Sequence, residues 1–185
     1  MSSEYIKGLF LKTRVLVWDV DASRRLWSNG FYGKPLGIPK PKSPDFSAPL
    51  LLDLLEAVYL VEKNILKVYD VNGKEMGIEG LMKNAEKTYH RFKEKYMVYK
   101  DLREKGYIVL SGLKFGVDFA VYEKGPGLEH APYLIDVVIS NDKISGDELV
   151  RAGRLATTVR KRFIIAIPNK QANKVDYMIF SWWKP

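Results

Sequence analysis

Apolar and polar residues alternate over short stretches at the start of the chain and form longer apolar runs after it. The alternation in residues 5–33 predicts short strands separated by turns at Gly8, Asp21 and Gly30. Five prolines in residues 33–49 exclude a helix or a central strand there. The next segments predict, in order, a helix, a strand, a turn and a helix, over residues 50–64, 65–70, 72–74 and 79–89.

After residue 90 the pattern becomes typical of a sheet. A helix predicted over 91–106 ends at Gly106, a residue common just after helices. A later helix, over 145–161, has Ser145 and Glu148 at capping-box spacing. Five segments rich in β-branched and aromatic residues predict strands, and they are 107–115, 117–124, 133–140, 162–168 and 177–184. The apolar face of the later helix comprises Leu149, Ala152, Ala156 and Val159.

Together these patterns predict a mixed α/β (α+β) protein of two domains. Residues 1–89 are expected to form a small N-terminal α/β domain with a proline- and lysine-rich loop at 33–49. Residues 90–185 are expected to form a C-terminal domain around a mixed sheet. The last predicted strand has large apolar side chains on both faces, so we expect part of it to be buried against another subunit.

Composition narrows the possible chemistry. The chain of 185 residues has no cysteine and two histidines, which excludes disulfides and argues against a zinc site. No apolar run approaches the roughly 20 residues of a membrane span, and the first residues lack the layout of a signal peptide, so we expect a cytoplasmic protein without membrane contact.

The net charge of +8 lies mainly in the second half of the chain. Residues 1–90 hold 13 basic and 11 acidic residues, whereas residues 91–185 hold 17 and 11. Such a charge either keeps the chain soluble or attracts a polyanion such as nucleic acid. Similarly, Lys34, Lys40 and Lys42 mark the loop 33–49 either as a plain linker or as a contact for backbone phosphates.

Three side chains are candidates for chemistry. Tyr122 ends one predicted strand, His130 lies in the glycine-proline turn that follows, and Lys161 precedes another strand. Each residue alone also has an ordinary explanation, as a half-buried tyrosine, a solvated turn histidine or a lysine at a helix end.

The motifs around these residues resemble those of one enzyme family. The segments FGVDFAVY…GP…HAPYLI, LATTVRKRFIIAI and FSWWKP are similar to the catalytic subunit of archaeal tRNA-splicing endonucleases. The strong resemblance covers residues 96–185 and implies a C-terminal catalytic nuclease domain of the restriction-endonuclease-like type. Residues 1–90 match the family more loosely, in length and in the order of elements.

The resemblance also implies a reaction without metal or cofactor. The 2′-hydroxyl of the RNA attacks the adjacent phosphate and leaves a 2′,3′-cyclic phosphate and a 5′-hydroxyl. The family triad falls on Tyr122 as base, His130 as acid and Lys161 as the cation that stabilises the phosphorane. A tyrosine is a poor base at its ordinary pKa of about 10, and we expect the nearby Lys161 to favour the phenolate.

Substrate and assembly follow from the same resemblance. The family cuts precursor tRNA at bulge-helix-bulge sites, and it holds bulge bases with arginine and tryptophan residues that correspond here to Arg154 and Trp182. The adjacent Trp183 leaves the tryptophan assignment ambiguous. The family forms tetramers, and the loop before the last strand is basic where the family has an acidic one. We therefore expect a heterotetramer with a related non-catalytic chain, or otherwise a homotetramer.

Two alternatives remain open from the sequence. A metal-dependent nuclease of the restriction type would use carboxylates such as Asp118 and Asp136, although no lysine follows Asp136 at the spacing of that motif. A non-catalytic RNA-binding subunit would be expected to lack the triad.

Overall fold

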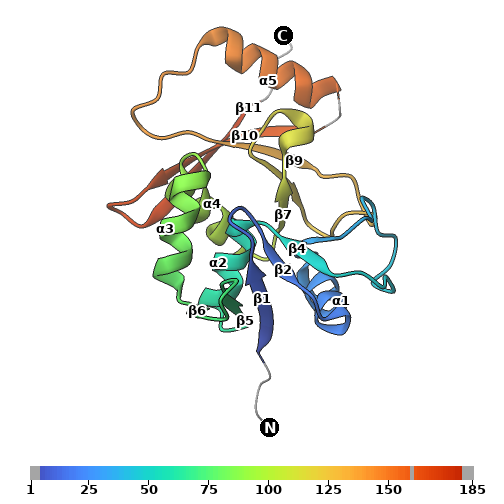
Figure 1. Ribbon diagram of the computed structural model, residues 1–185. Coiled ribbons are helices and arrows are strands. Elements are labelled where there is room, and N and C mark those ends of the chain that lie inside the picture. Colours follow the sequence, from blue (N-terminus) through green and yellow to red (C-terminus); the bar gives the residue numbers. More distant parts are fainter. Residues whose placement is uncertain (1–4, 159–160, 181–185) are drawn as a thin grey trace. The chain divides into compact units, whose positions relative to one another are not determined.

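A computed structural model describes residues 5–158 and 161–180 (Figure 1). The described residues form two compact units, which meet in the sequence between Phe92 and Lys93. Each unit has its own mixed sheet, which confirms the predicted mixed α/β class. No helix among the described residues is long and apolar enough to cross a membrane.

The N-terminal unit is built on a six-stranded sheet in the order β3-β4-β2-β1-β5-β6. Strands β1 and β5 run parallel, and the other paired strands are antiparallel. Its elements are β1 (Ile6–Phe10), β2 (Val15–Val17), α1 (Val20–Gly30), β3 (Lys34–Pro35), β4 (Leu50–Leu52), α2 (Leu54–Glu62), β5 (Leu66–Tyr69), β6 (Glu75–Met76) and α3 (Ile78–Thr88).

Three predictions for the first 30 residues of this unit were wrong. Gly8 lies inside β1 rather than in a turn. A glycine fits this position because a Cβ would come within 2.5 Å of the Val15 side chain on the paired strand. Asp21 lies in the first turn of α1, which Asp19 caps by accepting a hydrogen bond from the backbone N–H of Ala22 at 2.6 Å. Gly30 ends that helix, so a helix replaces the strands expected there.

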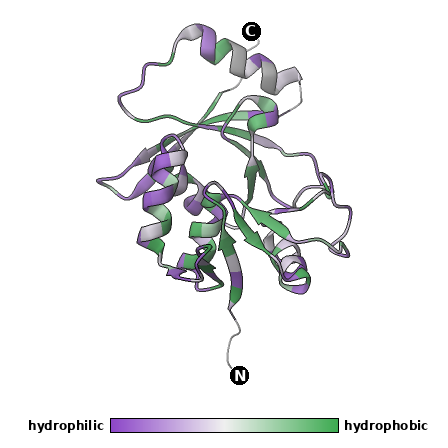
Figure 2. Ribbon diagram, viewed as in Figure 1, coloured by the Kyte–Doolittle hydropathy of each residue, from purple (hydrophilic) through white to green (hydrophobic). Residues whose placement is uncertain are grey.

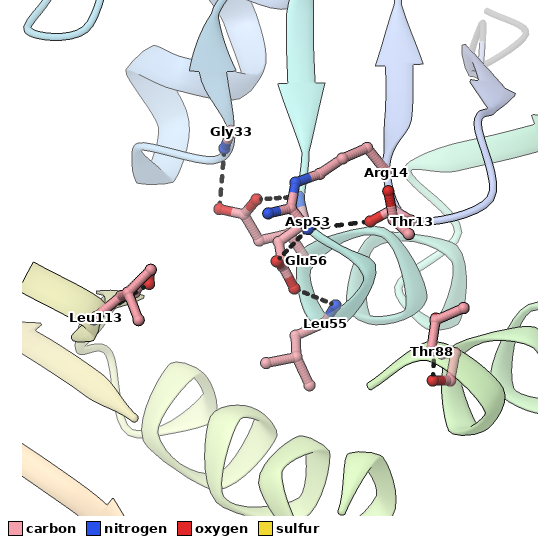
Figure 3. Close-up of polar contacts among 10 residues, drawn as sticks. Thr13, Arg14, Gly33, Asp53, Leu55, Glu56, Thr88 and Leu113 are labelled. Atoms are coloured by element: carbon pink, nitrogen blue, oxygen red, sulfur yellow. Dashed lines mark hydrogen bonds and ion pairs between the residues drawn. The ribbon is translucent and has the colours of Figure 1, made fainter. Parts of the chain in front are cut away.

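The predicted helix over 50–64 also begins later than expected. Residues 50–52 form β4 instead, and Asp53 and Glu56 make a capping box at the start of α2. The Glu56 carboxylate also accepts a hydrogen bond from the backbone N–H of Gly33 at 2.9 Å, so it holds the beginning of the proline-rich loop (Figure 3).

The proline-rich loop leaves the sheet at its edge. Pro35 lies in the edge strand β3, where the missing N–H of proline interrupts no central ladder. Lys34, Lys40 and Lys42 are all exposed.

The C-terminal unit has a five-stranded sheet in the order β11-β10-β9-β8-β7. Only β9 and β10 run parallel among these paired strands, and α5 lies between them in the chain. The elements are α4 (Phe92–Glu104), β7 (Ile108–Ser111), the 3₁₀ helix η1 (Leu113–Phe115), β8 (Phe119–Tyr122), β9 (Tyr133–Val137), α5 (Gly146–Thr158), β10 (Arg162–Asn169) and β11 (Lys174–Phe180). All five predicted strands and both predicted helices are present, with two corrections to the strand bounds. Residues 113–115, expected to end the first strand, form the 3₁₀ helix η1 after the turn at Gly112. The last strand begins at Lys174 rather than at residue 177, and residues 181–184 of its predicted range lie outside the described residues.

Helices pack on both faces of this second sheet. On one face the ring of Tyr99 in α4 lies 6.3 Å from that of Phe119, centroid to centroid. On the other face Leu149 of α5 packs against a cluster that includes Ala120, Leu134 and Phe163. The apolar strands between the helices are visible as green ribbon in Figure 2.

The start of α5 is capped as predicted. The backbone N–H of Glu148 donates to Ser145 Oγ at 3.2 Å, and the backbone N–H of Ser145 donates to Glu148 Oε2 at 2.8 Å. The side chains of Ala152, Ala156 and Val159 lie outside the described residues.

Candidate active site

Strand register brings the candidate residues to one end of the C-terminal sheet. Val121 pairs with Tyr133, and Tyr133 pairs with Arg162, so these three residues form a row across β8, β9 and β10. Tyr122 follows Val121 on β8, whereas Lys161 precedes Arg162. Because β8 runs antiparallel to the other two strands, Tyr122 and Lys161 lie on the same side of this row, toward the same end of the sheet. Strands are spaced about 4.8 Å apart, which places the two backbones roughly 10 Å apart.

Both side chains face the same side of the sheet. Tyr122 and Phe115 pack against the apolar cluster on the α5 side. The Lys161 Nζ lies 5.3 Å from the centroid of the Phe115 ring, so it shares that side.

Lys161 is tied to the loop that carries His130. Its Nζ donates to the backbone carbonyl of Ala131 at 2.5 Å, and Ala131 is the residue directly after His130. His130 itself is exposed in the connection between β8 and β9. The structure therefore brings Tyr122, the His130 loop and Lys161 together at one end of three neighbouring strands.

A second cation lies beside Lys161. The Lys114 Nζ is 5.4 Å from the centroid of the same Phe115 ring. Burial in the first place, and the charge of Lys114 in the second, lower the pKa of Lys161. Two ammonium groups around one ring repel each other, and a bound phosphate would relieve that repulsion.

The environment of Tyr122 differs from the expectation. Burial first, and the nearby carboxylate of Glu129 second, raise the pKa of its phenol. This direction is opposite to the lowering expected from Lys161, because desolvation of the half-buried ring opposes the phenolate. The phenol is therefore protonated in the free protein at neutral pH.

The two carboxylates of the metal-dependent alternative are already engaged within the sheet. Asp136 Oδ1 accepts from the backbone N–H of Asp118 at 3.0 Å, and Asp118 Oδ2 accepts from that of Val137 at 2.9 Å. The Lys95 Nζ lies 2.6 Å from Asp118 Oδ1. Across the described ranges, no group of three or more histidine, aspartate or glutamate side chains could hold a metal ion. The carboxylates of Asp118 and Asp136 therefore hold the β8 and β9 segments of the chain together.

The predicted RNA-binding residues are divided between the two units. Arg154 is exposed on α5, in the same unit as the triad. Lys34, Lys40 and Lys42 belong to the N-terminal unit. Trp182 lies outside the described residues, as does the neighbouring Trp183.

Four parts of the site were not predicted from the sequence: Lys114, Phe115, the backbone carbonyl of Ala131, and Glu129. A backbone carbonyl carries no sequence signal. Glu129 does leave one, since an acidic residue that follows Gly125 and Gly127 in a short loop can bind the backbone amides of that loop.

Comparisons with known proteins show relatives over nearly the whole chain. The family model described as "tRNA intron endonuclease, catalytic C-terminal domain" matches residues 92–177, and the model for the N-terminal domain of the same family matches residues 6–82. A tRNA-splicing endonuclease of Hyperthermus butylicus is 49% identical over 180 residues, which cover 97% of this chain and 99% of the relative. Those of Saccharolobus islandicus and Saccharolobus solfataricus are 47% and 45% identical over the same shares of chain and relative. This chain belongs to the family of tRNA-splicing endonucleases.

Proposed function

We propose that this protein cuts precursor tRNA at bulge-helix-bulge sites and needs no metal for the chemical step. It cleaves by attack of a 2′-hydroxyl of the RNA on the adjacent phosphate. The products are a 2′,3′-cyclic phosphate and a 5′-hydroxyl. The observation that supports this most strongly is the bond from Lys161 to the residue beside His130, at the same sheet end as Tyr122.

The proposed step balances its protons through two side chains. The phenolate of Tyr122 takes the proton of the 2′-hydroxyl while the 2′-oxygen bonds to phosphorus. The imidazolium of His130 gives its proton to the leaving 5′-oxygen as the P–O bond breaks. Lys161 stabilises the additional negative charge of the phosphorane. Tyr122 is left protonated and His130 neutral, and proton exchange with water restores both.

The raised pKa of Tyr122 gives this mechanism a distinct pH dependence. The reacting form needs an ionised tyrosine, and only a small fraction of Tyr122 is ionised below its raised pKa. The supply of phenolate is therefore expected to increase with pH until that pKa is reached.

For recognition, we propose that Arg154, which is exposed, and Trp182 hold the bulge bases, and that Lys34, Lys40 and Lys42 contact backbone phosphates. A planar guanidinium or indole stacks on any base and contributes about 1–3 kcal/mol per base. The lysines carry no sequence information and add salt-dependent affinity.

For assembly, we propose a heterotetramer with a related non-catalytic chain, or otherwise a homotetramer. The support is the edge strand β11, where the side chains of Met178 and Ile179 are 45% and 58% exposed. Excision of an intron needs two cuts, and a symmetric assembly provides two active sites at a fixed separation. The mass of the chain, alone and with a related chain, tests this directly.

The activity is tested by single-turnover cleavage of an end-labelled bulge-helix-bulge RNA in excess EDTA. The matched control is the same RNA with both bulges closed by pairing, which should resist cleavage. We expect cyclic phosphate and 5′-hydroxyl ends at an undiminished rate. An absolute requirement for Mg²⁺, or 5′-phosphate ends, would contradict the proposal and favour the metal-dependent alternative.

A further inference from the structure

The loop between β8 and β9 folds around its own acidic side chain. Glu129 Oε1 accepts hydrogen bonds from three consecutive backbone N–H groups, those of Glu123 at 2.6 Å, Lys124 at 2.5 Å and Gly125 at 3.4 Å. These three residues begin the loop directly after Tyr122. One carboxylate oxygen therefore joins the start of the loop to the residue that precedes His130.

The backbone closes the same turn from the other side. The carbonyl of Gly125 accepts from the backbone N–H groups of Leu128 and Glu129, both at 3.2 Å. Gly125 has a φ of 120° and Gly127 a φ of 89°, values that side chains disfavour and glycine tolerates. The turn is thus shaped to bring the Glu129 side chain back over the amides that precede it.

His130 depends on this turn for its position. Within the part of the chain that the structure describes, the imidazole has no hydrogen-bond partner, and the side chain is exposed. Its location is set by the backbone on either side. After His130, the carbonyl of Ala131 binds Lys161; before it, the carboxylate of Glu129 binds the start of the loop.

We propose that Glu129 is a positioning residue for the reaction, and that its carboxylate oxygen holds the loop so that His130 can reach the leaving oxygen. The inference rests on the proposed role of His130 as general acid. Hydrogen bonds from backbone N–H groups to a carboxylate are the stronger, charge-assisted kind, and a displacement of about 1 Å in a catalytic group can cost roughly 10²-fold in rate.

The ionisation of Glu129 agrees with this role. The backbone N–H groups, with that of Lys124 first, hold the pKa of its carboxyl below the ordinary value. The amides of the loop therefore favour the carboxylate form of Glu129, which is the form that accepts their hydrogen bonds.

A matched pair of substitutions separates the acceptor from the bulk of the side chain. Glu129→Gln keeps an acceptor oxygen at the same position, whereas Glu129→Leu has similar size and no acceptor. We expect Glu129→Leu to lower the single-turnover rate constant about 10- to 100-fold while RNA affinity stays within about threefold. Glu129→Gln should retain the rate within about fivefold. In hydrogen exchange, the amides of residues 123–125 should lose protection in the leucine variant and keep it in the glutamine variant.

A double-mutant cycle with His130→Ala separates positioning from a general structural effect. Because Glu129 positions His130, Glu129→Leu should not lower the rate of the His130→Ala protein further. Loss of its charge, which raises the pKa of Tyr122, can only act in the opposite direction in that background. The inference is overturned if Glu129→Leu cleaves within threefold of the unmodified protein, if glutamine is as damaging as leucine, or if the loss is undiminished in the His130→Ala background. A His130→Ala protein with an undiminished rate would instead overturn the proposed role of His130, and with it this inference. The exchange of the three amides would still show whether Glu129 holds the loop.

Discussion

Replacement of Glu56 by alanine is expected to destabilise the N-terminal unit by about 3 kcal/mol. The side chain is 7% exposed, and its two oxygens bind different parts of the unit. Oε2 accepts from the backbone N–H of Asp53 at 2.7 Å, and Oε1 accepts from that of Gly33 at 2.9 Å (Figure 3). The first contact starts α2, and the second holds the beginning of the proline-rich loop.

The expected loss of stability is the sum of two terms, one for each backbone N–H group that loses the Glu56 carboxylate as its acceptor. The N–H of Gly33 is buried, and a buried donor left without a partner costs about 1–3 kcal/mol. Loss of a helix cap costs about 0.5–2 kcal/mol, and the Asp53 half of the capping box remains. The sum centres near 3 kcal/mol. Glu56→Gln should cost less, because one oxygen remains to accept.

The assay is urea denaturation combined with hydrogen exchange of the Gly33 and Asp53 amides. The matched control is Glu79→Ala, which removes an exposed glutamate from the first turn of α3 and should cost at most about 0.5 kcal/mol. A loss for Glu56→Ala below about 1 kcal/mol, or no greater than that of the control, would show that the two hydrogen bonds do not stabilise the unit. Unchanged exchange at Gly33 would show that the carboxylate does not hold the loop.

Three further predictions concern the reaction and its substrate. His130→Ala should lower the single-turnover rate about 10²- to 10⁴-fold with RNA affinity unchanged, and a near-normal rate would remove it as the acid. In that variant the rate should rise about tenfold per pH unit to beyond pH 10, because burial raises the pKa of Tyr122 and the phenolate is the reacting form; a rate that becomes level below pH 9 would identify another base. Replacement of Lys34, Lys40 and Lys42 by alanine should weaken RNA binding and lower the slope of log affinity against log salt by about one unit per lost phosphate contact, whereas an unchanged slope would leave the loop a linker.

The sequence predicted elements best where the periodic pattern was long. Long apolar faces marked the helices α3 and α4, and runs of β-branched residues marked the strands of the C-terminal unit. Each of these patterns fits one type of secondary structure better than the other. The errors arose where two explanations of a short signal compete. Gly8 allows two strands to approach closely rather than forming a turn. Leu50–Leu52 form a strand with Leu50 and Leu52 buried, and this strand directly precedes a capped helix.

The contacts within the candidate active site were harder to predict from the sequence than the helices and strands. Tyr122, His130 and Lys161 could be named from their motifs, and the register then places Tyr122 and Lys161 at one end of the sheet. The raised pKa of Tyr122 could not be anticipated, because it depends on the burial of the ring and on where the Glu129 carboxylate lies after the loop closes. The hydrogen bond from Lys161 to the backbone carbonyl of Ala131 likewise depends on how the chain folds, because the two residues are 30 positions apart in the sequence.

Attack by the 2′-hydroxyl can be tested with an RNA that carries a single 2′-deoxy nucleotide immediately 5′ of one scissile phosphate. Attack by the 2′-hydroxyl requires that one oxygen, so we expect no detectable cut at the substituted site, normal cleavage at the other site and unchanged binding. The matched control carries the deoxy nucleotide on the 3′ side of the same phosphate and should be cut normally. Cleavage of the substituted site within about tenfold of the normal rate would mean that water is the nucleophile, and it would exclude attack by the 2′-hydroxyl.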